Sequence, residues 1–392
     1  MIQKVVVSNF KSIRDLSLEL NALSVLIGPN NAGKTNVLDI FGFLSRFLQG
    51  NNQQSADVFF LGNTSNELTI ELSGTARSDL KYRYYMSFFE RNGEVNSNKE
   101  IFEIIIGSSQ PTTIFSSESA KQNLRMMIPD TSGRQDSFEV GRNSREIGLK
   151  RAAEIAHDRL RQTGKNTVPG HPVLMSLSLA YQAIAGYCRY NLEPSRMRAS
   201  LQVNEQLSPG DLGQNLAQVL HTLHSKYRRQ SFDIIEDQLK SISPGITELV
   251  SDLRGNMTSI AIRETHSENL IPSASMPDGI LKLIGLLVIL NLPNKRPLIS
   301  IEEPENYIHP YAQNAVAGLI KAYAEEYQLA ITTHSPTFLS NFDLSDILVV
   351  GKIDGETKAK RPSNTEGLKK LLAEVGMDIG TAWYAGHLEE NQ

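Results

Sequence analysis

The sequence at residues 24–38 reads SVLIGPNNAGKTNVL. Its first four residues form an apolar run typical of a buried strand, and a turn rich in glycine and asparagine follows. Lys34 and Thr35 then begin a predicted helix. The segment matches the pattern G-x-x-x-x-G-K-[ST], which between a strand and a helix predicts a phosphate-binding loop.

Each part of this loop has an expected role toward a nucleotide. Gly28 and Gly33 allow the backbone to turn its N–H groups inward, and the positive end of the helix adds to the attraction for anions. The Lys34 side chain is expected to reach the β- and γ-phosphates, and the Thr35 hydroxyl to ligate Mg²⁺. We therefore predict ATP and Mg²⁺ as ligands, with the nucleotide held by Gly28, Asn30, Asn31, Ala32, Gly33, Lys34, Thr35 and Asn36.

Length and composition set wide limits on the function. A chain of 392 residues allows two or three domains, or one large domain with insertions. The net charge of −4 gives no global sign of nucleic-acid binding, so a DNA contact would need a local basic patch. Cys188 is the only cysteine, which excludes an internal disulfide and a multi-cysteine zinc cluster and agrees with a cytoplasmic location.

No membrane partner is expected. The N-terminus lacks the apolar core of a signal peptide. The longest apolar run, Leu283–Leu290, is too short to cross a bilayer.

A second motif supplies the acidic groups that a phosphate loop lacks. An apolar strand is predicted before Glu302-Glu303-Pro304-Glu305. A carboxylate at this strand end, assigned to Glu302, can hold Mg²⁺ directly or through water. The neighbouring Glu303 is expected to polarise the attacking water as a general base.

A histidine follows the next predicted strand. Gln328–Thr333 reads as a strand, and His334 comes directly after it. A side chain there can hydrogen-bond the γ-phosphate or the attacking water, so we predict a catalytic role for His334. For His309 the sequence is compatible with support of a site residue, with a subunit contact and with plain packing.

Hydrophobic periodicity gives a coarse map of the remaining elements. Alternation of apolar and polar residues predicts a strand pair at the N-terminus and an antiparallel meander from Leu68 to Ile106. Gly107–Thr113 is predicted as a loop, and Arg145–Arg161 as an amphipathic helix. Towards the C-terminus we predict a strand at Ile347–Val350, a polar loop at Gly351–Asn364 and a final helix.

One segment is locally basic. Lys121–Lys165 holds ten Lys or Arg against six Asp or Glu, and a solvated helical face would have the same composition as a DNA-binding surface. No heptad pattern is sustained, so a long coiled coil is not expected. We divide the chain into the N-terminal part of a nucleotide-binding head, a mostly helical insertion with the basic segment, and the C-terminal part of the head, at residues 1–106, 107–270 and 271–392.

The order of these motifs resembles the ABC-type ATPase heads of the SMC, RecF and OLD-like group. The matching stretches are Asn9–Ser12, Gly28–Thr35, Ile301–Asn306 with His309-Pro310, and Thr332–Pro336. Within that group the chain is most similar to compact AAA ATPases without a long coiled coil. The resemblance implies an α/β fold: a phosphate-loop core of mixed or parallel sheet flanked by helices, an antiparallel β subdomain and a helical inserted subdomain. Where this chain has Glu302, the family often has Asp.

The resemblance also implies a signature loop, which in a head-to-head dimer caps the nucleotide bound by the other subunit. Its counterpart here contains Ser275 and Gly279, with Pro277 where the family usually has Ser. Gly279 would open a helix whose N–H groups face that phosphate. The family's Q-loop glutamine has only Gln53 and Gln54 as candidates.

The motifs are compatible with three functions. The first is an ATPase that dimerises or forms a higher oligomer on ATP and acts as sensor and regulator of a separately encoded effector, such as a nuclease, in antiphage defence. It follows from family analogy and from the absence of an acidic cluster after His334 that would suggest a nuclease site. The alternative is a DNA-repair or recombination ATPase that clamps DNA directly. A transport-type ABC subunit is disfavoured by the Asn9–Ser12 start.

Overall fold

A computed structural model describes residues 1–50, 56–77, 79–118, 121–129, 135–141, 148–162, 172–294, 296–363 and 365–386. Its contacts divide the chain into two compact units. The first comprises Met1–Asn21, Gly28–Tyr187 and Val350–Lys360, and the second comprises Ala22–Ile27, Cys188–Val349 and Arg361–Gln392. The three-part division at residues 106 and 270 stays a prediction.

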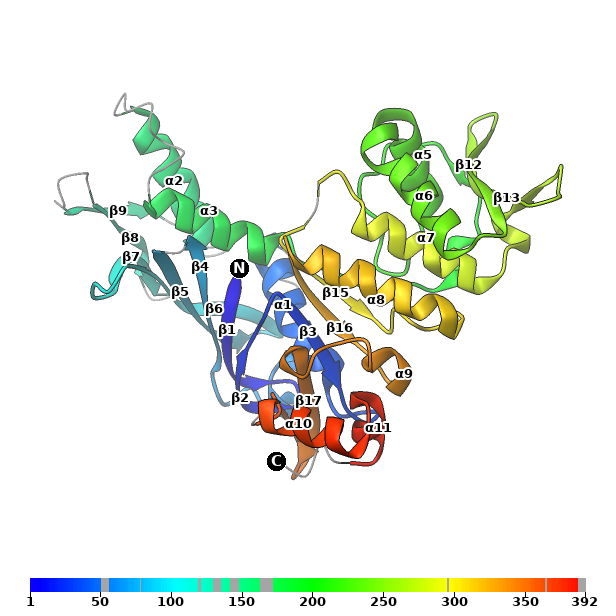
Figure 1. The fold of residues 1–392 in the computed structure, drawn as a ribbon. Helices are drawn as coiled ribbons and strands as arrows, with labels where there is room; N and C mark the ends of the chain where they lie inside the picture. Colours follow the sequence, from blue (N-terminus) through cyan, green and yellow to red (C-terminus); the bar gives the residue numbers. More distant parts are fainter. Residues whose placement is uncertain are drawn as a thin grey trace. The chain divides into compact units, whose positions relative to one another are not determined.

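The first unit contains an eight-stranded antiparallel sheet with the order β2-β1-β4-β5-β6-β7-β8-β9 (Figure 1). Period-two alternation explains these strands, as in β5, where Tyr82 and Tyr84 are buried and Lys81 and Arg83 are exposed. The strand bounds are β1 (Ile2–Phe10), β2 (Ile13–Glu19), β4 (Leu68–Arg77), β5 (Leu80–Arg91), β6 (Glu94–Ile106), β7 (Thr112–Glu118), β8 (Lys121–Pro129) and β9 (Gln135–Gly141).

The predicted meander thus continues beyond Ile106. Strand β7 begins at Thr112, inside the predicted loop, because Ile114 and Phe115 are buried in the sheet and the threonines beside them are good strand formers. Helix α2 (Gly148–Gln162) matches the amphipathic helix predicted nearby, and α3 (Pro172–Ala185) packs on β4 and β5. Of the basic segment, Arg134, Arg142, Arg145 and Lys165 lie outside the described residues.

Helix α1 (Lys34–Leu48), which follows the phosphate loop, is anchored in the first unit by aromatic side chains. Phe43 on α1 meets Phe10 of β1 with ring centroids 5.7 Å apart, and meets Phe88 of β5 at 5.0 Å. Phe47, one turn further, contacts Phe88 at 4.9 Å. Edge-to-face pairs of buried rings fix both distance and orientation, so the sheet holds in place the helix and the end of the phosphate loop, where the helix begins.

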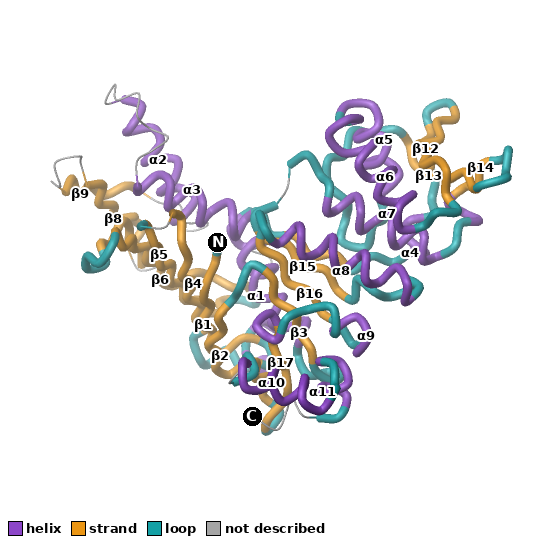
Figure 2. Tube along the Cα trace, in the orientation of Figure 1, coloured by secondary structure: helices purple, strands orange, loops and turns teal. Residues whose placement is uncertain are grey.

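The second unit is built around a largely parallel sheet with the order β10-β15-β16-β3-β17-β18, of which β18 and the end of β17 fall in the first unit. Figure 2 labels its strands β15, β16, β3 and β17. Strands β3 and β16 are buried along their whole length, as expected for parallel strands covered on both faces. The strand bounds are β10 (Cys188–Tyr190), β15 (Leu298–Glu302), β16 (Gln328–Thr332), β3 (Leu23–Ile27), β17 (Ile347–Ile353) and β18 (Glu356–Lys360).

Strand β18 corrects the predicted polar loop Gly351–Asn364. Glu356–Lys360 has three charged residues among five, a composition typical of a loop, but Thr357 and Ala359 are buried and alternate with exposed or partly exposed neighbours. A turn at Asp354 and Gly355, both with positive φ, joins it to β17.

The helices of the second unit include one that is buried on all sides over most of its length. Helix α7 (Asp278–Leu290) is buried from Leu281 to Leu290, which explains the longest apolar run of the sequence. The other helices around this sheet are α8 (Pro310–Ala324), α9 (Pro336–Leu339), α10 (Thr365–Val375) and α11 (Ile379–Tyr384). Within the described ranges, every helix is too short or too polar to cross a lipid bilayer.

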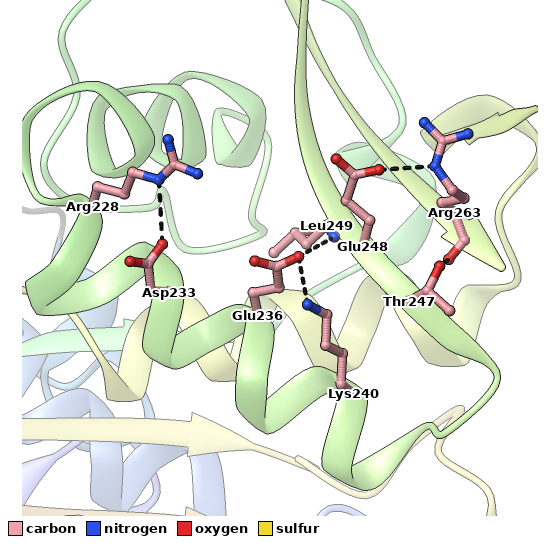
Figure 3. Close-up of polar contacts among 8 residues, drawn as sticks. All are labelled: Arg228, Asp233, Glu236, Lys240, Thr247, Glu248, Leu249 and Arg263. Carbon is pink, nitrogen blue, oxygen red and sulfur yellow. Dashed lines mark hydrogen bonds and ion pairs between the residues drawn. The ribbon is translucent and has the colours of Figure 1, made fainter. Parts of the chain in front are cut away.

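A further part of the second unit combines helices with a small antiparallel sheet. Glu236 of α6 accepts a hydrogen bond from the Leu249 N–H of β12 at 3.2 Å and pairs with Lys240 at 2.9 Å, which fastens the helix to the strand (Figure 3). Arg263 and Glu248 form a cross-strand ion pair at 2.9 Å. The elements here are α4 (Pro194–Met197), β11 (Leu201–Gln202), α5 (Leu216–Lys226), α6 (Asp233–Ile242), β12 (Ile246–Arg254), β13 (Met257–Glu264) and β14 (Leu270–Pro272).

Candidate functional site

Three parallel strands of the second unit end at the same edge of the sheet. Glu302 at the end of β15 pairs with Thr332 at the end of β16, and Thr332 pairs with Leu26 of β3. The chain leaves β3 at Ile27 and enters the phosphate loop at Gly28. The carboxyl edge of a parallel sheet is where α/β proteins bind their ligands, and here it carries the acidic motif.

The carboxylate of Glu303 is held by its neighbours. Its backbone has a φ of 43°, a left-handed conformation that is rare for a residue with a side chain, and its N–H donates to the Thr332 carbonyl at 3.1 Å. The Asn306 amide donates to Glu303 Oε2. His334 Nε2 lies 3.9 Å from Glu303 Oε1, so the two predicted catalytic residues are neighbours.

Glu302 has a different environment. Its carboxylate pairs with Arg189 of β10, with Oε1 3.3 Å from the guanidinium Nε. In the part of the chain that the structure describes, no three His, Cys, Asp or Glu side chains gather into a metal-binding group. A single carboxylate suits Mg²⁺, which binds proteins through one or two carboxylates and completes its shell with phosphate oxygens and water.

The second glutamate after the strand, Glu305, is buried with 4% of its surface exposed. Its Oε1 accepts a 2.5 Å hydrogen bond from the Thr333 hydroxyl, and that hydroxyl accepts the Ser335 N–H at 3.0 Å. Its Oε2 has no hydrogen-bond partner among the described residues. Burial raises the pKa of Glu305, while hydrogen bonds from Thr333 and from backbone N–H groups oppose that rise. Glu305 therefore links the acidic motif to the turn that carries His334.

A buried lysine lies on the helix that follows the signature segment. Lys282 of α7 is 1% exposed, and its Nζ donates to the Leu192 carbonyl at 3.1 Å. Burial lowers the pKa of Lys282 to about 8, although the charges of Glu305, Glu303 and Glu302 favour its protonated form. The helix thus places a positive charge within electrostatic reach of the acidic motif.

The signature segment packs directly against the loop after the acidic motif. A side chain at Gly279 would bring its Cβ within 2.5 Å of the Tyr307 carbonyl oxygen, so only glycine fits this contact. Tyr307 itself has a φ of 69° and is 62% exposed. Ser275 is exposed on a 3₁₀ turn (Ser273–Ser275) just before α7, and His309 caps α8 by accepting the Tyr311 N–H at 3.3 Å.

In the first unit, the phosphate loop requires both of its glycines. Gly28 has a φ of 148°, and a Cβ there would lie 2.0 Å from the Val350 carbonyl oxygen. Gly33 has a φ of 102°, and its Cβ would lie 2.1 Å from Thr357 Oγ1. Asn31 also has a positive φ, of 64°. The sequence pattern G-x-x-x-x-G therefore reflects backbone geometry that other residues would strain.

The start of α1 has the features of an anion site. The N-cap residue, Gly33, makes no side-chain capping hydrogen bond, and the first turn of the helix has no acidic residue that would repel an anion. Lys34 is 8% exposed and folds back over the loop, where its Nζ donates to the Gly28 and Pro29 carbonyls at 2.9 and 3.0 Å. Asn30, Asn31 and Thr35 are exposed. These groups fit a polyphosphate.

The Asn9–Ser12 motif forms the turn between β1 and β2. Lys11 has a φ of 49° and pairs with Asp39 of α1. The Ser12 hydroxyl accepts a hydrogen bond from the Asn36 amide at 2.5 Å. This turn therefore reaches the first turns of the helix that follows the phosphate loop.

The structure gathers the predicted site residues in two groups. Glu302, Glu303, His334, Ser275 and Gly279 belong to the second unit, and the loop residues 28–36 belong to the first. Gln53 and Gln54 lie outside the described residues. The roles of these residues toward a nucleotide stay predictions.

Sequence reasoning missed four residues that the structure ties to the site. For Glu305 a signal was present, since it belongs to the acidic motif. Thr333 lies in the matching stretch Thr332–Pro336, but the sequence does not show its bond to Glu305. Nothing in the local sequence marks the roles of Lys282 and Thr357, because these come from burial and from distant partners.

Comparison with known proteins follows the same lines. A family model described as "AAA domain, putative AbiEii toxin, Type IV TA system" matches residues 23–340. The Old nuclease of Escherichia phage P2 is 22% identical over 412 residues, covering 97% of this chain and 64% of that protein. The OLD nuclease of Thermus scotoductus (strain ATCC 700910 / SA-01) is 23% identical over 390 residues, covering 92% and 65%. The chain therefore spans less than two thirds of the length of the curated relatives it matches.

Among solved structures, the crystal structure of the SmcHead bound to the C-winged helix domain of ScpA is similar, with a TM-score of 0.52 at 14% identity. The alignment covers 94% of this chain and 99% of that one. This likeness concerns the fold, and it confirms the predicted α/β head of ABC-ATPase type. The chain is thus similar to OLD nucleases in sequence and to an SMC head in fold. Since the family model spans most of the chain, the protein belongs to the AAA domain family that this model describes.

Proposed function

We propose that this protein hydrolyses ATP between two copies of itself and uses the cycle to control an effector. The observation that carries the proposal is the Glu303–His334 pair, 3.9 Å apart, at the strand edge from which β3 leads into the phosphate loop. A carboxylate that can take a proton from water, beside a histidine that can donate a hydrogen bond, is an arrangement suited to activating a water molecule.

In this proposal Glu303 is the general base. The Glu303 N–H donates to the Thr332 carbonyl, which holds its left-handed backbone. The Asn306 amide donates to Glu303 Oε2, so Oε1 is the oxygen that would accept the proton from water. The side chain is 37% exposed, which leaves room for a water molecule. His334 would donate a hydrogen bond to the γ-phosphate or to that water. Bound Mg²⁺, with Glu302 as its carboxylate ligand, would neutralise charge that develops on the phosphate oxygens.

Self-association is supported by the exposure of the signature segment. Ser275 lies on the surface, and Gly279 packs on the loop of Tyr307, which is itself exposed. We infer a head-to-head dimer, or a higher oligomer built from it, in which these groups meet the nucleotide of a second copy. ATP would favour the closed state through its contacts with both copies.

The names of the relatives support an effector as part of this proposal. Both curated relatives are named nucleases, and the matching family is described as a toxin of a toxin–antitoxin system. We infer that the ATPase cycle gates a nuclease-type effector encoded separately, in a cytoplasmic defence against phage.

The base assignment is tested by Glu303→Gln, which keeps the size of the side chain. The hydrolysis rate should fall by about 100-fold or more, because a general base contributes about 10² to 10⁴. Bound ATP and the dimer should accumulate, as measured by light scattering coupled to size-exclusion chromatography. An unchanged rate would remove Glu303 from this role.

Lys34→Ala is the companion variant for the phosphate loop. It should lose ATP binding and remain monomeric, and full nucleotide affinity would contradict the loop assignment. Co-purification with the product of a neighbouring nuclease gene would support the effector role. ATPase stimulation by bare DNA that declines steeply with salt would instead favour a DNA clamp.

A further inference from the structure

A chain of polar side chains in the first unit ends on the phosphate loop. Asn36 of α1 donates to Ser12 Oγ at 2.5 Å, and Ser12 Oγ lies 2.7 Å from Thr357 Oγ1 of β18. Thr357 Oγ1 donates to the Ala32 carbonyl at 3.0 Å. Ser12 and Thr357 are 345 residues apart in sequence. They are joined a second time, by the Thr357 N–H bonded to the Ser12 carbonyl at 2.7 Å.

Counting hydrogens shows which group donates in each of these hydrogen bonds. A hydroxyl has one hydrogen to donate, and Thr357 uses it on the Ala32 carbonyl. Thr357 Oγ1 must therefore accept the hydrogen of Ser12. The Ser12 oxygen in turn accepts from the Asn36 amide, which has no other choice because its nitrogen is a donor only. Asn36 thus donates to Ser12, Ser12 to Thr357, and Thr357 to the Ala32 carbonyl of the loop.

Thr357 also fills the space that Gly33 leaves open. An added Cβ at Gly33 would lie 2.1 Å from Thr357 Oγ1 and 2.7 Å from its methyl carbon. Thr357 is fully buried. The glycine of the loop motif and this threonine are therefore fitted to each other.

The consequence concerns the peptide between Ala32 and Gly33. A trans peptide is planar, with its C=O and N–H directed to opposite sides. Because Thr357 holds the Ala32 oxygen, the Gly33 N–H must face away from β18. We propose that Ser12 and Thr357 are positioning residues that fix this peptide, so that the loop presents its N–H groups to the phosphates.

The inference rests on the proposed function in so far as the loop binds ATP. It gives the Asn9–Ser12 motif a role, and it assigns the Asn36 amide to support of the loop. The C-terminal hairpin of β17 and β18 becomes part of the nucleotide site through Thr357.

The test compares Thr357→Val, which has the same shape without the hydroxyl, with Thr357→Ser, which keeps it. Binding of ATPγS, measured by calorimetry, should weaken about 10-fold in the valine variant, since one lost buried hydrogen bond costs about 1.4 kcal/mol. The serine variant should bind within about threefold of the unchanged protein. Ser12→Ala should weaken binding in the same direction as valine.

Thr222→Val is the matched control. Thr222 is 2% exposed, and its hydroxyl accepts the Gln206 N–H at 3.1 Å and donates to the Gln218 carbonyl at 3.0 Å, in the second unit. It should leave nucleotide affinity unchanged. Equal affinity of Thr357→Val and the unchanged protein would overturn the inference.

A second readout needs no nucleotide. Hydrogen–deuterium exchange at residues 28–36 should speed up in Thr357→Val and stay slow in Thr357→Ser, and equal exchange in both would overturn the inference. If the unchanged protein failed to bind ATPγS, the proposed function would fail, and the exchange data would still decide the role of Thr357.

Discussion

Replacing Lys282 by methionine should change how the stability of the protein depends on pH. Methionine has a similar length and no charge, so the substitution removes the buried ammonium from α7 with little change in packing. The ammonium is 1% exposed and has a pKa near 8, lowered from 10.5 by burial.

The direction of the pH dependence follows from the number of protons that Lys282 binds in the folded and in the unfolded chain. Below pH 8 Lys282 is protonated in both the folded and the unfolded chain, so it gives no pH dependence. Between about 8 and 10.5 the unfolded chain binds more protons, and stability therefore rises with pH. The full gain is about 3 kcal/mol, from about 1.4 kcal/mol for each tenfold change in proton affinity. About 2 kcal/mol of it should be visible between about pH 7 and 9.5.

The sequence offers a local probe for this measurement. Trp383 is its only tryptophan, and it packs against the core of the second unit, which also contains Lys282. Urea unfolding followed by Trp383 fluorescence should show the free energy of unfolding rising with pH relative to Lys282→Met. Lys369→Met, on the surface of α10, controls for the loss of one positive charge. If the curves for the unchanged protein and Lys282→Met ran parallel from pH 7 to 9.5, the lowered pKa of Lys282 would be refuted.

The remaining predictions concern the loop and the histidine turn. Gly33→Ala should lower the melting temperature more than Gly355→Ala. Both glycines have positive φ, but of the two only Gly33 has a neighbour, Thr357, in the space that a Cβ would occupy. Equal losses would show that the steric overlap with Thr357 has no energetic cost. Thr333→Val should cost about 1–3 kcal/mol of stability, because Glu305 loses its hydroxyl donor. Thr333→Ser keeps the hydroxyl and should retain most of that stability. Calorimetric melting compares the two variants, and equal stabilities would contradict the role given to the Thr333–Glu305 hydrogen bond.

Local chemistry explains why the core of the site could be predicted from sequence. The pattern from Gly28 to Thr35 records backbone angles and donors that lie next to each other in the chain, so it is legible without the fold. Glu303 and His334 were found for a related reason, since each follows an apolar strand and parallel strands end at one edge. The structure places them as neighbours.

The residues that were missed depend on contacts between distant segments. Thr357 lies in a stretch of charged residues, and its burial becomes visible only once β18 is placed. Lys282 sits in an apolar helix where periodicity predicts burial but cannot show what the ammonium faces. Strand β7 was partly hidden by its serines and threonines, which are equally common in loops.

The left-handed backbone of Glu303 lowers the stability of the protein at the residue for which we propose a chemical role. A residue with a side chain in this region costs about 1 kcal/mol or more, and glycine or asparagine would relieve part of that cost. Variants selected only for heat resistance should therefore drift toward glycine or asparagine at position 303 and arrive there without the carboxylate. With the base role proposed for Glu303, keeping glutamate in this turn costs stability, and the most heat-resistant variants are expected to be those that have lost hydrolysis.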